Sequence, residues 1–343
     1  MMRRLMTVCA VILMVSSVVS GELFQDGGDR LAELQNDDGG WGWPLTGTSA
    51  TNTVGPIAMG LAKAYENTGD TDQLAALQKA ATYLQTKALY SPSDGYLAAE
   101  LDRVLGTTAN VAAVKANFYD KLAAGTYVGK GGTVYSTETY IAYIQTARSG
   151  TQANMAAWDI GMGVVGATAA GADASLWIAA TQSEIDELAA DNYYGVLGLA
   201  GALYGLSYAG VEYDPTGGWV ASAGSLTEMA DILVASQADS GGFTWWVEVG
   251  DGYEAVQETA YAILALNEVD RALYQDEVLN AGAYLRSVQL ATGGWENYGG
   301  SGENNEVTGE ALWAESVVVP VPGAVLLGVL GLAAAGRKLR KHV

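Results

Sequence analysis

The sequence predicts an all-α protein built from repeated helical hairpins. Three observations predict it: one short motif occurs three times, an amphipathic stretch precedes each copy, and a helix rich in small residues follows each copy. At 343 residues, the chain exceeds the ordinary single-domain length, which favours two domains or a repeat array. Because no Pro/Ser-rich linker divides it, a repeat array is the better interpretation.

The motif consists of Gln, two glycines at the fourth and fifth following positions, and an aromatic residue at the sixth. It is found in LAELQNDDGGWGW, SQADSGGF and VQLATGGW. Its residues are Gln35, Gly39, Gly40 and Trp41; Gln237, Gly241, Gly242 and Phe243; and Gln289, Gly293, Gly294 and Trp295. Two glycines permit a turn with positive φ that ends a helix, and a large aromatic ring can seal the junction.

Each copy follows an amphipathic stretch: GDRLAELQ, LTEMADILVASQ and DEVLNAGAYLRSVQ. In the last one Val278, Ala281, Leu285 and Val288 recur at helical spacing. The helices predicted after the motif contain NTVGPIAMGLAKAY, QETAYAILAL and VTGEALWAE. The repeating unit is therefore helix, Gly-Gly-aromatic turn, helix.

The spacing of the units predicts about six hairpins. Phe243 and Trp295 are 52 residues apart, and Trp41 is 55 residues from Tyr96 in the degenerate string SPSDGY. Two more units fit between Tyr96 and Phe243, although their motifs are poorly marked. Gln145 with Gly150, and the string TQSEIDELAADNYYG, are the candidates.

These repeats resemble the QW repeats of squalene and oxidosqualene cyclases and the related prenyltransferase repeats. The resemblance implies an α/α toroid of five to six helical hairpins, here over residues 25–312, with two concentric rings of helices around a central cavity. It also implies that the Gln and the aromatic residue of each motif clamp neighbouring hairpins together.

The N-terminus resembles a secretory signal peptide at residues 1–20. Arg3 and Arg4 precede an apolar run, and Val18-Val19-Ser20 offers small residues for cleavage before Gly21. The sequence therefore predicts an exported protein.

The C-terminal segment 317–336 has no charge and is long enough to span a membrane as a helix. The basic tail at 337–343, which includes Arg337 and Lys338, is predicted to stay in the cytoplasm and leave the toroid outside. With Pro320 and Pro322, this end resembles a PEP-CTERM sorting signal, although its proline motif has no glutamate. The resemblance implies an exosortase as a partner, and either an inner-membrane anchor or a cell-surface or extracellular location after processing.

Composition excludes several chemistries from the segment between these ends. Cys9 and His342 are the only Cys and His residues, so disulfides, cysteine nucleophiles, Ser-His-Asp triads and zinc sites of the usual ligands are not expected. The formal net charge is −21, which argues against nucleic acid as a partner. No cofactor is predicted. Calcium at Asn36–Asp38 or Glu303–Glu306 stays an alternative, although neither cluster has EF-hand spacing.

The groups that react in the resembling families are also missing, because the chain has no D-x-D-D acid. The leading functional prediction is thus a non-catalytic binding or extracellular-matrix protein, with extracellular polysaccharide as a partner. The alternative is a carboxylate-dependent polysaccharide lyase or glycoside hydrolase. Its candidate acids lie at predicted starts of inner helices: Glu138, Asp159, Glu258 and Glu310. Each could instead be an ordinary first-turn acid that favours the helix dipole.

Two further features bear on function. Trp245 and Trp246 are adjacent in a polar loop, where both cannot face a helix core, so one is expected to line the cavity mouth or to stack on a sugar ring. The string at 161–166 matches G-x-G-x-x-G but follows no strand, so close helix packing is predicted there instead of a dinucleotide site. A second functional alternative, a divergent terpenoid cyclase-like protein, would require an apolar cavity.

Overall fold

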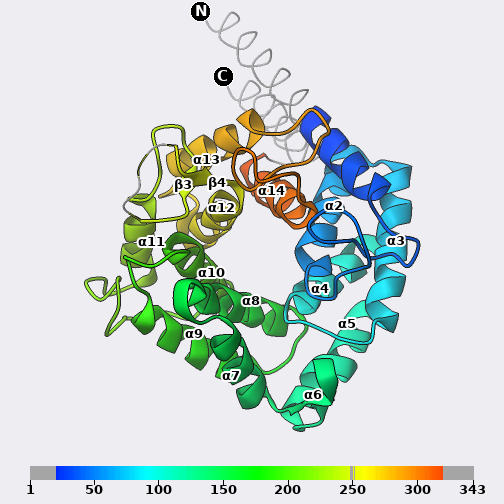
Figure 1. The fold of residues 1–343 in the computed structure, drawn as a ribbon, viewed down its shortest axis with the longest axis horizontal. Coiled ribbons are helices and arrows are strands. Elements are labelled where there is room, and N and C mark those ends of the chain that lie inside the picture. Colours follow the sequence, from blue (N-terminus) through cyan, green and yellow to red (C-terminus); the bar gives the residue numbers. More distant parts are fainter. Residues whose placement is uncertain (1–20, 248–249, 251, 320–343) are drawn as a thin grey trace, which may run out of the picture.

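The structure is a computed structural model that describes residues 21–319 except 248, 249 and 251. Helices form a ring of two concentric layers (Figure 1). The inner layer consists of α2 (Val54–Thr68), α4 (Ser93–Leu105), α8 (Met155–Ala169), α10 (Gly195–Tyr208), α12 (Val256–Asp270) and α14 (Asn305–Val318). Each inner helix packs against the next, and α14 packs against α2, which closes the ring.

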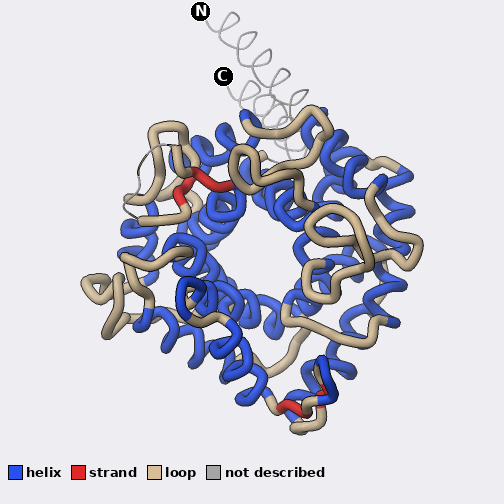
Figure 2. The backbone as a smooth tube through the Cα atoms, in the orientation of Figure 1, coloured by secondary structure: helices blue, strands red, loops and turns tan. Residues whose placement is uncertain are grey.

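The outer layer begins with helical residues 21–33. It continues through α3 (Thr71–Thr86), α5 (Ala109–Val114), α6 (Asp120–Ala123), α7 (Thr137–Ala147), α9 (Ser175–Glu187), α11 (Leu226–Val234) and α13 (Gln275–Ser287). Strands are confined to two antiparallel pairs, β1 (Tyr127–Val128) with β2 (Val134–Tyr135) and β3 (Phe243–Thr244) with β4 (Glu254–Ala255), in the described part of the chain (Figure 2). The all-α prediction and its hairpin pattern are thus confirmed.

The core lies between the two layers and within the inner helices themselves. Outer helices bury one face, as Leu77 of α3 and Trp177 of α9 illustrate, whereas residues 195–206 of α10 are all buried. A helix surrounded on all sides needs no polar stripe. This arrangement explains why the inner helices read as runs of small and apolar residues.

Glycines allow the inner helices to approach each other closely. A Cβ atom added to Gly60 of α2 would lie 2.1 Å from the carbonyl oxygen of Gly309 of α14. Within the predicted packing segment, a Cβ on Gly161 would lie 2.4 Å from the Gly201 oxygen, and one on Gly166 would lie 2.0 Å from the Pro92 oxygen. Residues 161–166 lie inside α8, and their glycines serve helix packing.

The three Gln-Gly-Gly-aromatic motifs share one geometry at the outer layer. The Nε2 atom of Gln35 donates to the Gly39 oxygen at 3.0 Å and to the Ala76 oxygen of α3 at 2.8 Å. Gln237 repeats this pattern with the oxygens of Gly241 and Glu277, both at 2.9 Å. Each glutamine therefore closes its own turn and also holds the next outer helix.

The third motif joins the two ends of the outer layer. Gln289 donates to the Gly293 oxygen at 2.8 Å and to the Leu23 oxygen at 3.3 Å. Gly293 has φ +91°, and a Cβ there would lie 2.3 Å from the Asp26 oxygen, so this turn requires glycine. Trp295 is fully buried, and its Nε1 donates to the Leu285 oxygen at 2.9 Å.

Some sequence-based expectations differ from the structure or fall outside it. Tyr96 is not a turn aromatic, because α4 begins at Ser93 and buries Tyr96 in its first turn. The helical region extends beyond the predicted 25–312, from residue 21 to Val318. In the part of the chain that the structure describes, no helix is both long and apolar enough to cross a membrane.

Several predictions concern the two chain ends. The predicted signal peptide (1–20), the basic tail (337–343) and the sorting residues Pro320 and Pro322 lie outside the described residues. The predicted span 317–336 does as well, apart from residues 317–319.

Candidate active site

Carboxylates gather at one end of the ring because the inner helices begin there. An outer helix precedes each inner helix, so all inner helices start at the same end of the ring. The starts of α10 and α8 are close, because a Cβ added to Gly198 of α10 would lie 2.3 Å from the oxygen of Asn154, the residue before α8. Glu258 lies in the first turn of α12 and Glu306 in the first turn of α14. Acids at these positions favour the helix dipole.

Glu306 is partly exposed and accepts a hydrogen bond of 2.9 Å from the Trp43 Nε1. Burial raises the pKa of Glu306 to about 7; the Trp43 hydrogen bond opposes the rise, and the negative charge of Asp159 adds to it. Asn305 positions the loop that carries Trp43, because its Nδ2 donates to the Gly42 oxygen at 3.0 Å and the Leu45 oxygen at 2.8 Å.

Asp159, on α8, forms an ion pair with Arg148, whose Nε lies 2.6 Å from the Asp159 Oδ2. About a quarter of each side chain is exposed, 26% for Asp159 and 27% for Arg148. Burial raises the pKa of Asp159, and the charge and hydrogen bond of Arg148 oppose that rise. Asp159 is therefore a carboxylate that ligands can reach and that carries its own cation.

Glu310 and Glu258 lie beneath this surface and are fully buried. Glu310 accepts hydrogen bonds from the Gln257 Nε2 at 3.1 and 3.0 Å and from the Tyr261 hydroxyl at 3.0 Å. Burial, together with the charge of Glu306, holds the pKa of Glu310 well above its ordinary value. Neither acid is exposed to a ligand, so both can act on the site only through the charges and contacts beneath its surface.

Glu258 differs from Glu310 in having no hydrogen bond from another side chain among the described residues. Neither of its carboxylate oxygens has a hydrogen-bond partner among the described residues. Burial raises the pKa of Glu258 to about 7. A buried carboxylate without a partner is costly in the charged form, so Glu258 holds a proton more readily than an exposed acid.

Glu138 does not belong to this site. It lies in the first turn of α7, an outer helix, where it is exposed and accepts a hydrogen bond of 2.7 Å from the Ser136 hydroxyl. The expectation that it begins an inner helix is wrong. Conversely, Glu306 belongs to the site but was not predicted as a catalytic candidate, although it precedes Glu310 by one helical turn and so shares its face.

Aromatic rings form a cluster next to the carboxylates. The Tyr193 ring lies 6.0 Å from Trp245 and 5.0 Å from Trp246, and the Trp245 ring lies 5.5 Å from Tyr298. Tyr193 is 38% exposed and Tyr298 48% exposed. Trp245 and Trp246, which were predicted to include a ligand contact, therefore pack against partly exposed tyrosines from separate loops.

Tyr194 connects this cluster to the carboxylates. Burial raises its pKa, and the charge of Glu258 adds to the rise. With φ +62°, Tyr194 is the one non-glycine residue of the described chain with positive φ, a conformation that is uncommon for bulky side chains. Asn154 holds this loop, because its Nδ2 donates to the Ala189 oxygen at 2.9 Å and the Tyr193 oxygen at 3.1 Å.

The described residues contain no cluster of acidic side chains of the kind that the calcium alternative would need. No group of three or more His, Cys, Asp or Glu side chains there could hold a metal ion. Glu303 instead pairs with Arg30, at 2.7 Å from its Nε, and Asp38 accepts a hydrogen bond of 2.6 Å from the Ser49 hydroxyl.

Comparisons with known proteins place the chain by fold. No protein-family model and no curated protein matches the sequence. A possible member of the GH105 family from Klebsiella pneumoniae superposes with a TM-score of 0.54 at 10% identity, over 86% of this chain and 91% of that chain. An unsaturated glucuronyl hydrolase from Streptococcus agalactiae gives a TM-score of 0.50 at 10% identity, over 88% and 90%.

A type II terpene cyclase from Scytonema is also similar, with a TM-score of 0.49 at 13% identity over 89% of this chain and 98% of that chain. At such identities the likeness concerns the fold, which is an α/α toroid. Function must therefore be argued from the side chains.

Proposed function

We propose that this protein is a carboxylate-dependent glycoside hydrolase, with Glu306 as the general acid and Asp159 as the general base. The observation that carries the proposal is the pairing of two reachable carboxyl groups in different environments. The pKa of Glu306 is raised to about 7, whereas Asp159 is held by Arg148. Burial raises the pKa of both carboxyls, but Arg148 opposes the rise at Asp159. Glycoside hydrolysis requires one carboxyl that donates a proton and one that accepts it.

The roles follow from these environments. Protonated Glu306 would donate its proton to the glycosidic oxygen as the bond to the sugar breaks. Asp159 would accept a proton from the water that attacks the sugar, so that one water is consumed for each bond cleaved. Glu310 and Glu258 stay buried and shape the electrostatics of the site, and Gln257 and Tyr261 fix the Glu310 carboxylate.

The aromatic cluster supports a saccharide as the substrate. Trp245, Tyr298 and Tyr193 present partly exposed rings from loops beside the carboxylates. Aromatic faces combined with nearby polar groups are typical of sugar sites. The partly exposed ion pair Asp159–Arg148 does not favour the terpenoid cyclase alternative, because that alternative requires an apolar cavity.

Turnover on a panel of neutral and acidic oligosaccharides tests the proposal. The Glu306→Gln and Asp159→Asn variants should each lose at least about a hundredfold in kcat on any substrate that the wild type cleaves. Glu138→Gln is the matched control, since Glu138 is also a first-turn acid but lies on an outer helix. Activity that survives both site variants, or that falls equally in the control, would contradict the proposal.

The panel also separates the alternatives. A lyase would release products with a new carbon–carbon double bond, which absorb in the ultraviolet, and would consume no water. Saturable binding without turnover, lost on Trp245→Ala, would instead support the non-catalytic binding protein that the sequence favoured. The aromatic cluster is the observation on which that second candidate rests.

The cellular location is also part of the proposal. We infer export from the residues at 1–20, and an inner-membrane anchor or exosortase processing from those at 317–343. An exported hydrolase would meet extracellular polysaccharide, which fits the saccharide site. Fractionation of cells that express the full chain, with membrane and medium compared, tests this location.

A further inference from the structure

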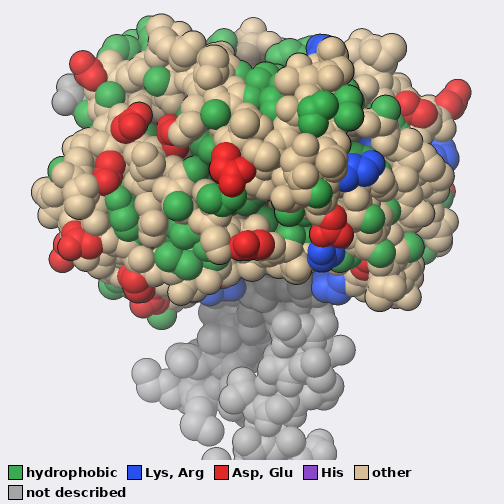
Figure 3. All heavy atoms as spheres, turned by 90° about the horizontal axis from the view of Figure 1, so that it is seen from below, with side chains coloured by type: hydrophobic (Ala, Val, Ile, Leu, Met, Phe, Trp, Pro, Cys, Tyr) green, Lys and Arg blue, Asp and Glu red, His purple; other side chains and the backbone are tan. Residues whose placement is uncertain are grey.

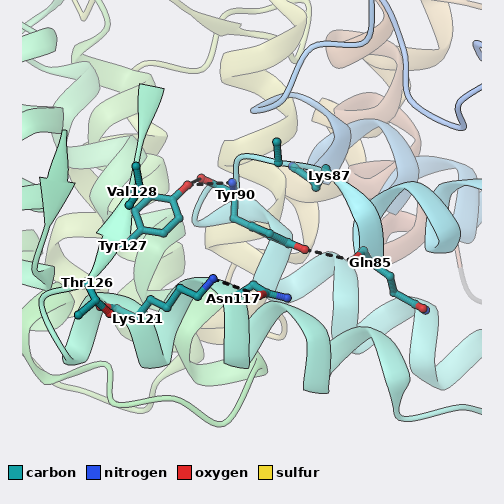
Figure 4. Close-up of a pocket in the computed structure, with 9 residues that line it drawn as sticks. Gln85, Lys87, Tyr90, Asn117, Lys121, Thr126, Tyr127 and Val128 are labelled. Carbon is teal, nitrogen blue, oxygen red and sulfur yellow. Dashed lines mark hydrogen bonds between the residues drawn. The ribbon is translucent and has the colours of Figure 1, made fainter. Parts of the chain in front are cut away.

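A pocket of about 560 Å³ lies away from the carboxylates, where the end of α3, the helix from α5 to α6 and the β1–β2 hairpin meet (Figure 4). Its polar lining comes from Gln85, Lys87, Tyr90, Asn117, Lys121, Thr126 and Tyr127. This volume lies within the range of small-molecule sites, roughly 300–1,000 Å³.

One wall is a helix with an irregular turn. Residues Lys115–Tyr119 form a π-helix between α5 and α6. Such turns are rare and recur at functional sites. Here Phe118 and Tyr119 are buried behind the turn, while Asn117 and Lys121, four residues apart, both line the pocket.

Two tyrosines form a rigid part of the opposite wall. The Tyr127 hydroxyl accepts a hydrogen bond of 2.9 Å from the Tyr90 backbone N–H and donates one of 2.9 Å to the Tyr90 oxygen. Phe118 packs edge-on against Tyr127, with ring centroids 5.0 Å apart. These bonds fix the Tyr127 ring against the Tyr90 backbone before any ligand arrives.

The pocket carries a free positive charge in an acidic protein. Lys121 forms no ion pair in the described part of the chain, and its Nζ lies 3.3 Å from the Asn117 Oδ1. The neighbouring acid, Asp120, is already paired with Lys115. Lys87 is neutralised by Asp94, whose two oxygens both lie 2.8 Å from its Nζ.

No acidic side chain lines the pocket. The surface around the ring is not uniformly acidic. In Figure 3, acidic side chains are scattered across the side of the ring, while Lys and Arg side chains gather toward its right-hand part. A negative ligand would therefore find its main attraction at Lys121.

We propose that this pocket binds a small sugar acid, with its carboxylate on Lys121 and its hydroxyls on the Asn117 amide. A free ammonium selects an anion, and an amide can both donate to and accept from hydroxyl groups. The site does not depend on the proposed hydrolase, because it shares no residue with it.

Calorimetric titration of the full chain with glucuronate tests the proposal, with glucose and inorganic phosphate as comparison probes. Glucuronate should bind saturably, and Lys121→Gln should weaken its binding at least about tenfold, because a charge-assisted hydrogen bond is lost. Lys130→Gln, an exposed lysine of the β1–β2 hairpin outside the pocket lining, is the matched control and should bind as the wild type does.

The comparison probes decide the remaining points. Glucose should bind at least about tenfold more weakly than glucuronate, since it cannot use the ammonium. Phosphate that binds as tightly as glucuronate would overturn the sugar part of the proposal. Absence of saturable glucuronate binding, or equal losses in the Lys121 and Lys130 variants, would overturn the site itself. Circular dichroism of each variant checks that the fold is retained.

Discussion

Glu306 and Asp159 stand on opposite inner helices, yet the charge of Asp159 helps to raise the pKa of Glu306. Two helices separate α14 from α8 along either route around the ring. Ring closure thus brings together two acids that lie 147 positions apart in the sequence. Any chemistry at this site depends on the toroid remaining closed.

Replacing Trp43 with Phe should raise the pKa of Glu306 further. The Trp43 Nε1–H donates to the Glu306 carboxylate at 2.9 Å and so stabilises its charged form. Without the donor, the proton should remain bound to a higher pH than about 7. Carbon-13 NMR titration of the glutamate carboxyls checks this, with Glu306→Gln to assign the resonance. An unchanged or lower pKa in Trp43→Phe would contradict the assigned hydrogen bond.

Glu258 should make the protein less stable as the pH rises. In the folded protein its pKa is about 7, against 4.5 for the ordinary value that applies to the unfolded chain. Unfolding therefore releases this proton between these two pH values, and the free energy of unfolding falls across that window. Above pH 7 the loss amounts to about 3 kcal/mol.

Glu258→Gln removes that titration. Relative to the wild type, the variant should gain about 3 kcal/mol of stability between pH 4.5 and pH 8. Denaturant unfolding at several pH values measures the difference. The Glu138→Gln control should change little across the same window, because Glu138 is exposed and its pKa is lowered. A Glu258→Gln difference that does not vary with pH would show that the buried acid is not protonated.

Gly309→Ala should weaken ring closure between α14 and α2. The new Cβ would lie 2.4 Å from the Pro56 oxygen and 2.5 Å from the Ile57 Cα, and backbone atoms cannot yield by side-chain rotation. We expect a loss of about 3 kcal/mol. Gly299→Ala is the control, since no atom lies within 4 Å of its added Cβ, and it should change stability by under about 0.5 kcal/mol. Equal melting temperatures for the two variants would argue against close α2–α14 packing.

Gln35→Ala should loosen the first motif. It removes donors from the oxygens of Gly39 and Ala76, so the turn and the neighbouring α3 lose their shared side-chain contact. A loss of about 2 kcal/mol is expected. Gln78→Ala, at an exposed position of α3, should be close to neutral. If both variants unfold at the same denaturant concentration, the motif does not fasten the outer helices.

The sequence predicted the parts of the fold that local chemistry determines. The turn at Gly293 needs positive φ, which favours glycine, and the Trp295 ring fills a buried junction. Each copy of the motif can therefore be recognised in the sequence by its residue types. Tyr96 was misassigned because a Ser-Pro-Ser-Asp-Gly string suits a turn and also a helix start. Here the Lys87–Asp94 ion pair is buried at that start.

The candidate site was only partly predictable, because first-turn acids look alike in sequence. Glu138 and Glu306 both follow a helix start, but α7 lies in the outer layer and α14 in the inner layer. That difference depends on packing between distant segments. The pairing of Asp159 with Arg148 likewise arises from the bend between α7 and α8, which only the weak Gln145–Gly150 candidate marks.

The pH dependence of kcat/KM, compared between the wild type and Glu306→Gln, tests the assignment of the general acid most directly. We predict that wild-type activity on a cleaved oligosaccharide falls above about pH 7, as Glu306 loses its proton. The variant should lack this fall and be at least about a hundredfold slower at pH 6. The same alkaline decline in Glu306→Gln, or a wild-type profile that is flat through pH 7, would contradict the account.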